Sequence, residues 1–242
     1  MKKTLVLMVM ALLPALATAG GDEGVKLDPV SIDLNDKVSL QRGARIFVNY
    51  CLSCHSAGYM RYNRMARDLE IPEHIVKDEM LFAADKIGDL MKAVMPREDA
   101  KDWFGVAPPD LTLVARSRGP EWIYTYMRGF YLDDSTPSGW NNVVFQNVAM
   151  PHVLYEWQGL QRAKFEEVDG VKTFAGFELV KAGTKTPEEY DRLMRDLTNF
   201  FVYLGEPAKL VRYRLGWWVL AFLAVFFVVA YLLKKEYWKD VH

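Results

Sequence analysis

Two cysteines and a histidine stand together in Cys51-Leu52-Ser53-Cys54-His55, which follows the pattern C-x-x-C-H. In this pattern each thiol can add to one haem vinyl group as a thioether, and the adjacent histidine can then reach the iron. The chain has no other cysteine, so these two are not part of a four-cysteine zinc or iron–sulfur site. A C-x-x-C redox pair, or a metal site completed by distant histidines, is the alternative. A redox pair does not require the adjacent histidine, so the pattern favours one covalently bound haem c.

The ligand on the other face of the iron decides between electron transfer and ligand chemistry. Met150 is the leading candidate, because it follows a stretch predicted to be irregular, residues 136–148, and precedes Pro151. Proline favours an extended backbone at the residue before it, which suits a loop that delivers a side chain. His152 is the competing ligand, and an iron open to small molecules is the third possibility. A thioether ligand would raise the reduction potential and close the iron.

The N-terminal residues 1–19 have the composition of a secretory signal peptide. Lys2 and Lys3 precede a short apolar stretch, and Ala17-Thr18-Ala19 is a small-residue cleavage site. The alternative is a retained anchor, but the apolar run is short for a membrane span and contains Pro14. Export agrees with the haem motif, because c-type haem is attached outside the bacterial cytoplasmic membrane.

A second apolar segment, residues 215–233, contains 19 residues and no charged side chain. A helix of this length can cross the hydrocarbon core of a bilayer, which is about 30 Å thick. Lysines and arginines flank both ends equally, so the positive-inside rule does not orient the span. The signal peptide orients the span instead, because export places the preceding domain in the periplasm. We therefore expect a single-pass protein of the bacterial inner membrane that contacts membrane lipid.

The sequence predicts four parts: a signal peptide (1–19), an exported haem domain (20–208), a transmembrane helix with its flanks (209–236) and a cytoplasmic tail (237–242). The exported domain contains 22 Lys and Arg against 29 Asp and Glu, a formal charge of −7, although the whole chain is close to neutral. An acidic surface favours a basic partner and disfavours nucleic acid. It is equally consistent with simple solubility.

The periodicity of the exported domain is mostly helical. The pattern predicts helices from Ser39, as a cap, to Cys51, from Pro72 to Phe82, from Asp85 to Val94 and from Pro120 to Phe130. A helix from Pro187 to Leu204 has a strong start, because Thr186 and Glu189 form a capping box. Between them, residues 161–179 flank Asp169-Gly170, a favoured hairpin turn. The expected fold is mainly α, with a small β-hairpin insertion and a C-terminal transmembrane helix.

An ordered set of motifs resembles the cytochrome c1 family in its proteobacterial form, over the whole mature chain. After C-x-x-C-H come Ala107-Pro108-Pro109-Asp110-Leu111 and Ala115-Arg116-Ser117-Arg118-Gly119-Pro120. Trp140-Asn141-Asn142, Val148-Ala149-Met150-Pro151-His152 and Gly205-Glu206-Pro207 follow. The resemblance implies a haem domain like that of class I c-type cytochromes.

The resemblance also implies roles for individual residues. Met150 would be the sixth ligand of the iron, with His55 on the other face. Pro109 would lie against the haem, and Arg118, with Arg116, would meet a haem propionate through charge-assisted hydrogen bonds. Trp122 stands where some relatives have a tyrosine near the propionate, so its role is open.

By the same resemblance, the chain would be an electron carrier in quinol–cytochrome c reductase, the cytochrome bc1 complex. It would not be an enzyme on its own. It would accept an electron from the Rieske iron–sulfur protein and pass it to a soluble or membrane-bound cytochrome c, in a dimeric complex that also contains cytochrome b. Asp133-Asp134 and Glu166-Glu167 are candidate contacts for a basic acceptor.

Two other functions fit the residues. One is a membrane-anchored monohaem cytochrome that serves a terminal oxidase or a periplasmic dehydrogenase. The other is a haem-based gas sensor or peroxidase with an open iron, which would bind carbon monoxide when reduced.

Overall fold

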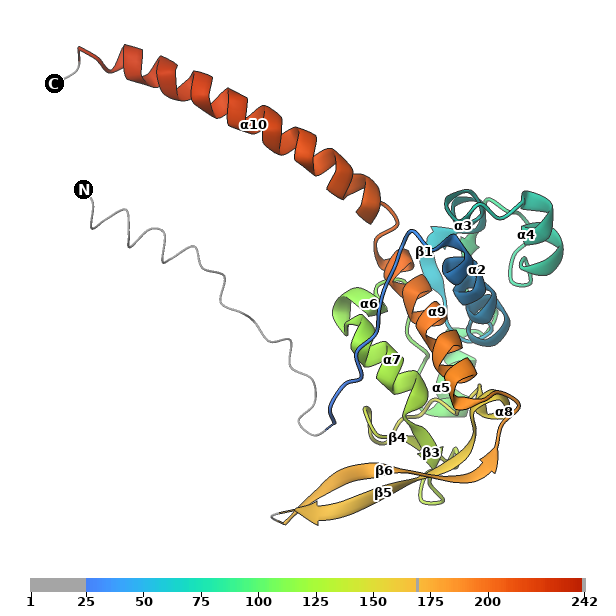
Figure 1. Ribbon diagram of the computed structural model, residues 1–242. Coiled ribbons are helices and arrows are strands. Elements are labelled where there is room, and N and C mark those ends of the chain that lie inside the picture. The colour runs from blue at the N-terminus through green and yellow to red at the C-terminus, as the bar shows by residue number, and fades with distance from the viewer. Residues whose placement is uncertain (1–24, 169, 241–242) are drawn as a thin grey trace. The chain divides into compact units, whose positions relative to one another are not determined.

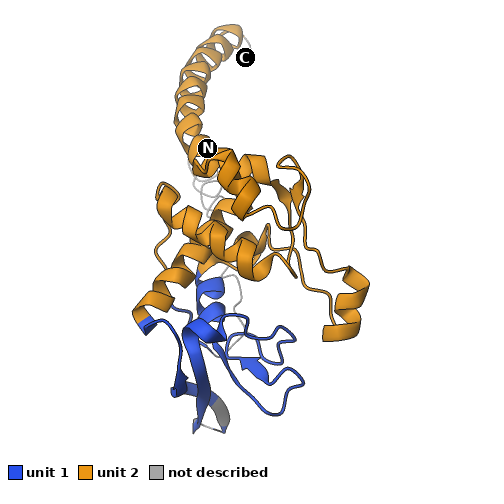
Figure 2. Ribbon diagram, turned by 90° about the vertical axis from the view of Figure 1, so that its right-hand side faces the viewer, with its two compact units in different colours: residues 1–29, 121–187 blue, residues 30–120, 188–242 orange. Residues whose placement is uncertain are grey.

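The computed structural model describes residues 25–168 and 170–240 (Figure 1). The expected signal peptide, residues 1–19, lies outside the described residues. The rest forms two compact units, which Figure 2 shows in different colours. Unit 1 contains the described residues up to 29 together with residues 121–187, and unit 2 contains residues 30–120 and 188–242. The C-x-x-C-H motif therefore belongs to unit 2, and Met150 to unit 1.

Unit 2 is mostly helical, and its two short strands pair antiparallel. Its elements are α2 (Lys37–Ile46), a π-helical turn η1 (Phe47–Cys51), β1 (Ala57–Arg61), α3 (Tyr62–Leu69), α4 (Glu73–Glu79), β2 (Leu90–Met91), α5 (Arg97–Phe104), α6 (Val114–Ser117), α9 (Pro187–Gly205) and α10 (Lys209–Tyr237). The first residue of α9 belongs to unit 1.

Unit 1 carries most of the β-structure. Its elements are α7 (Pro120–Arg128), whose first residue belongs to unit 2, β3 (Phe130–Leu132), β4 (Trp140–Asn142), α8 (Tyr155–Gln158), β5 (Gly159–Val168) and β6 (Val171–Ala182). Strands β3 and β4 pair antiparallel, as do β5 and β6. The register Val168↔Val171 shows that the two strands pair as a hairpin, and Asp169 of the predicted turn lies outside the described residues. The mainly α fold with small strand pairs is thus confirmed.

Helices α2 and α9 cross at Gly43. A Cβ atom at this position would lie 2.2 Å from the Asp196 carbonyl oxygen and 2.6 Å from the Phe200 Cβ, so only glycine allows this approach. The ring of Phe47 then packs on Phe200, with the centroids 5.7 Å apart, and on Phe201, at 5.9 Å. This close crossing fixes the helix that leads into the haem motif.

A buried carboxylate adds polar contacts to the same crossing. The side chain of Asp196 is 2% exposed and accepts hydrogen bonds from the Ser39 hydroxyl at 2.7 Å and from Arg42 Nε at 2.5 Å. These bonds offset the cost of burying the charge. The hydrogen bond to Asp196 is also the main cause that raises the pKa of Arg42.

The long helix α10 is apolar along most of its length, and none of its residues is buried. Its 29 residues extend roughly 44 Å at 1.5 Å per residue, which is enough to cross a bilayer. Residues 206–208 separate it from α9, so Gly205-Glu206-Pro207 ends the preceding helix as expected. Glu206 contacts Arg212 at 2.5 Å and Arg116 at 3.5 Å, and these ion pairs brace the short linker.

Four helix predictions need correction. The helix from Pro120 ends at Arg128, because Phe130 begins strand β3 and pairs with β4. The first helix begins two residues before Ser39, and Asp36 is its cap, because the Asp36 carboxylate accepts the Ser39 N–H at 2.9 Å. The helix after Pro72 ends at Glu79.

No helix covers residues 85–94. There, the Asp89 carboxylate accepts a hydrogen bond of 2.9 Å from the Lys86 N–H and stabilises a turn instead of a helix. Leu90 and Met91 then pair with β1 as strand β2. Sequence periodicity also missed α3 and α5.

Candidate functional site

The C-x-x-C-H motif begins where η1 ends. Cys51 is the last residue of this π-helical turn, a conformation that is common at functional sites. The N–H groups of Cys54 and His55 both bond to the Cys51 carbonyl, at 3.1 and 2.7 Å, and this tight turn gathers the two thiols and the imidazole in one short segment. Two more backbone hydrogen bonds, from Met95 to Ser53 and from Leu111 to Ser56, hold the segment from either side.

The His55 ring is oriented by a single hydrogen bond. Its Nδ1 lies 2.8 Å from the carbonyl oxygen of Pro109. A carbonyl can only accept, so Nδ1 carries the proton and Nε2 keeps the lone pair that a metal needs. Burial lowers the pKa of His55, which favours this neutral form. Pro109 therefore contributes its backbone oxygen, a role that its residue type alone does not reveal.

Both thiols are free. Cys51 and Cys54 form no disulfide, so each can add to a vinyl group. Burial, with Cys54 nearby, raises the pKa of Cys51 to about 12, so this thiol stays protonated and is a poor nucleophile in a redox exchange. The described residues also contain no group of three or more His, Cys, Asp or Glu that could hold a metal ion.

Met150 lies in a loop of unit 1 that two asparagines shape. The side-chain oxygen of Asn142 accepts the N–H groups of Val144 and Phe145, and its amide donates to the Tyr126 carbonyl at 2.8 Å. The oxygen of Asn141 accepts the N–H of Asn147 at 2.8 Å, where φ is +57°. The Trp-Asn-Asn motif thus fixes the loop. The motif itself is strand β4, so the stretch 136–148 is not irregular throughout, contrary to expectation.

The sulfur of Met150 accepts a hydrogen bond from the hydroxyl of Tyr126, with an O–S distance of 3.4 Å. Sequence reasoning missed Tyr126, although Trp122, Tyr126 and Phe130 recur at the four-residue spacing of one helix face. Burial raises the pKa of Tyr126 well above its usual range, so its hydroxyl remains a donor. The Trp122 ring stacks on the Tyr126 ring, with centroids 4.9 Å apart.

His152, the competing ligand, is buried among aromatic rings. It stacks on Phe130 at 4.9 Å and meets the edge of Trp140 at 5.1 Å. Neither ring nitrogen makes a regular hydrogen bond, and burial lowers the pKa of His152 to about 4. The imidazole is therefore a neutral part of this aromatic cluster.

The two arginines expected near a propionate are both exposed. Arg116 is paired with Glu206 at 3.5 Å, as described for the linker, whereas Arg118 follows α6 as its C-cap. The pairing of Arg116 gives it a structural role, and the propionate roles remain predictions for both residues.

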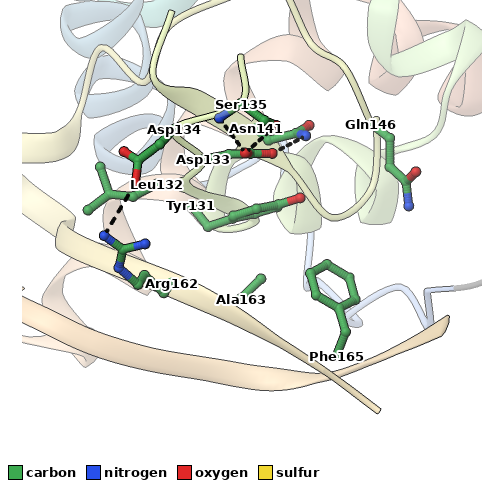
Figure 3. Close-up of a pocket in the computed structure, with 10 residues that line it drawn as sticks. All are labelled: Tyr131, Leu132, Asp133, Asp134, Ser135, Asn141, Gln146, Arg162, Ala163 and Phe165. Carbon is green, nitrogen blue, oxygen red and sulfur yellow. Dashed lines mark hydrogen bonds and ion pairs between the residues drawn. The ribbon is translucent and has the colours of Figure 1, made fainter. Parts of the chain in front are cut away.

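Unit 1 contains an open pocket of about 690 Å³ (Figure 3). Its lining is Tyr131, Leu132, Asp133, Asp134, Ser135, Asn141, Gln146, Arg162, Ala163 and Phe165, which includes none of the predicted ligands. Asp133 accepts bonds from Ser135 and Asn141, and Asp134 pairs with Arg162 at 3.7 Å. Asp133 therefore also stabilises its own turn, and its contact with an acceptor stays a prediction.

Comparison with known proteins agrees with this geometry. The model of the cytochrome c1 family matches residues 31–241. The chain belongs to the cytochrome c1 family. It is 52% identical to a cytochrome c1 of Allochromatium vinosum, over the full length of both chains. It is also 27% identical to a cytochrome c1 of Blastochloris viridis, over 85% of this chain and 82% of the relative.

Another relative carries a different name. The chain is 50% identical to a protein of Nitrosomonas europaea named ammonia monooxygenase gamma subunit, over 98% of this chain and 97% of the relative.

Membership of the cytochrome c1 family establishes the cofactor and the general role. Its members carry a covalently bound haem c and are membrane-anchored electron carriers of the cytochrome bc1 complex. The residues of this chain fit that cofactor: two free thiols stand beside a histidine whose Nδ1–H is already bonded, which leaves Nε2 for the iron. Helix α10 is a candidate for the anchor.

Proposed function

We propose that this chain is a one-electron relay from the Rieske iron–sulfur protein to a c-type cytochrome. Cys51 and Cys54 would hold the haem covalently, and His55 and Met150 would bind its iron. When bound, haem c supplies an iron that cycles between the ferrous and ferric states. The residues of the chain would hold both ligands, His55 and Met150, in place throughout and would make or break no substrate bond.

One observation carries this proposal: the hydrogen bond of 2.8 Å from His55 Nδ1 to the Pro109 oxygen. It prepares Nε2 as a permanent ligand, because a backbone carbonyl cannot take up or release a proton to change the tautomer. A fixed histidine and a thioether ligand suit an iron that changes charge without exchanging ligands. A sensor or peroxidase needs an open position instead.

The same proposal places the haem domain in the periplasm. Residues 1–19 are removed after Ala19, residues 20–208 form the exported domain, and residues 209–236 cross the inner membrane. The tail, residues 237–242, then lies in the cytoplasm. Support comes from the signal-peptide composition of residues 1–19 and from the export that C-x-x-C-H requires.

The test is the optical spectrum of the full-length holoprotein in the ferric state and in the ferrous state with carbon monoxide. The wild type should show the weak red band of a thioether bound to ferric iron, and it should not bind carbon monoxide. Met150→Leu should lose the band and gain carbon monoxide binding, whereas Met95→Leu, a control thioether, should resemble the wild type. Ready carbon monoxide binding by the wild type would overturn the relay.

Co-purification tests the partners separately. Cytochrome b and the Rieske protein should accompany the chain when membranes are solubilised in mild detergent. Isolation with a terminal oxidase or a dehydrogenase, and without cytochrome b, would instead show that the chain serves another complex.

A further inference from the structure

Two aromatic rings pack against Tyr126, whose hydroxyl contacts the Met150 sulfur. The Tyr126 ring is stacked on Trp122 at an interplanar angle of 11° and meets the edge of Phe130, with centroids 5.1 Å apart. Trp122 and Tyr126 stand one helical turn apart on α7, and Phe130 follows the helix as the first residue of β3. Since the rings restrict χ1 and χ2 of Tyr126, its hydroxyl points in a fixed direction rather than exploring several partners.

The partner loop is tied to the same residue. The Asn142 amide donates to the backbone oxygen of Tyr126, and the Asn142 side chain also closes the turn that leads toward Met150. Tyr126 therefore contacts this loop twice, through its carbonyl and through its hydroxyl. Both contacts lie within unit 1, so the sulfur and its donor belong to one packed body.

A thioether sulfur has two lone pairs. A metal takes one of them, and the second can accept a hydrogen bond at the same time. A donor on this second lone pair withdraws electron density from the sulfur, and a poorer donor ligand stabilises ferric iron less than ferrous iron. Hydrogen bonds to metal ligands tune metal sites in this way.

We propose that Tyr126 is a positioning residue for the relay: its hydroxyl holds the Met150 sulfur toward the iron and raises the reduction potential. This inference rests on the proposed ligation by Met150. The proposal adds a residue outside the haem-binding motifs and predicts the direction of its effect on the reduction potential.

The first experiment is a redox titration of the full-length holoprotein as wild type, Tyr126→Phe and Tyr124→Phe. Tyr124 stands on the same helix, and its ring faces the Arg128 guanidinium at 4.7 Å, so it is a matched control. Tyr126→Phe should lower the ferrous-to-ferric ratio at a fixed applied potential by about threefold to tenfold. A tenfold change corresponds to about 59 mV for one electron. Tyr124→Phe should leave the ratio unchanged.

A second variant keeps the test decisive if Tyr126→Phe fails to assemble. Placing 3-fluorotyrosine at position 126 preserves the ring and makes the hydroxyl a stronger donor, so the potential should rise. A purely structural role would not move the potential in opposite directions for the two changes.

The outcomes separate this inference from the proposed function. If the wild type shows the thioether band and neither change at position 126 moves the potential, Tyr126 has no tuning role and the relay stands. If the wild type lacks the band and binds carbon monoxide, Met150 is not the ligand, and both proposals are wrong.

Discussion

Gly43 and Phe200 meet so closely that a Cβ atom added at position 43 would lie 2.6 Å from the Phe200 Cβ. The contact joins α2, which leads to the haem motif, to α9, which leads to the membrane helix. A single hydrogen atom on Gly43 thus sets the distance between these two helices. The position of Cys51 at the end of η1 depends on the same crossing.

Gly43→Ala should destabilise the protein by about 1–3 kcal/mol, because the helices must separate and the core must repack. The Asp196 carbonyl oxygen, 2.2 Å from the added Cβ, is backbone and moves little. The midpoint temperature of thermal unfolding and the yield of covalently bound haem should both decrease. Both are measured on membranes from cells that express the variant. Gly88→Ala is the matched control, since a Cβ there meets nothing within 4 Å. Equal behaviour of the two variants would contradict the role of the crossing.

Asn142→Ala should loosen the loop that carries Met150. The side chain of Asn142 is fully buried and joins Tyr126 to the turn at Val144. Its removal leaves buried backbone groups without partners, at a cost of about 1–3 kcal/mol for each. We expect lower stability and partial carbon monoxide binding by the ferrous protein. The exposed amide Asn49, replaced in the same way, should change neither property; a stable Asn142→Ala protein that excludes carbon monoxide would refute the prediction.

Tyr62 should make stability depend on alkaline pH. It is fully buried, and burial raises its pKa to about 12. The unfolded phenol ionises near pH 10. The contribution of Tyr62 to the free energy of unfolding is therefore fully present below pH 10. It decreases by up to about 2–3 kcal/mol as the pH rises toward about 12. Urea unfolding across this range should show a larger loss in the wild type than in Tyr62→Phe, because the variant keeps only the contribution of other buried tyrosines such as Tyr126. Parallel curves would show that Tyr62 does not contribute.

Electron transfer to a basic cytochrome should slow as salt rises, since residues 20–208 carry a formal charge of −7. We expect about a tenfold decrease from low to high ionic strength. Glu166→Gln with Glu167→Gln should flatten the profile, because both side chains are exposed on β5. A neutral small-molecule oxidant is the control and should give a flat profile. The same flat profile with the basic cytochrome would exclude electrostatic steering.

Local signals in the sequence were enough for several elements. Pro187 and Glu189 mark the start of α9, and the hairpin of β5 and β6 follows from alternating residues around Asp169-Gly170. These features depend on neighbours in the chain. The segment 85–94 was predicted wrongly as helix, because pairing with β1 and the turn at Asp89 overrode its local periodicity.

The sequence by itself determined the cofactor chemistry, the apolar span and the family, because each depends on residue types at fixed spacing. Only the tertiary structure decided which atoms orient the ligands. Pro109 reaches His55 across 54 positions, and Tyr126 reaches Met150 across 24. Such contacts depend on how helices and loops pack. A backbone oxygen or a tyrosine hydroxyl leaves no mark in the sequence that identifies its distant partner.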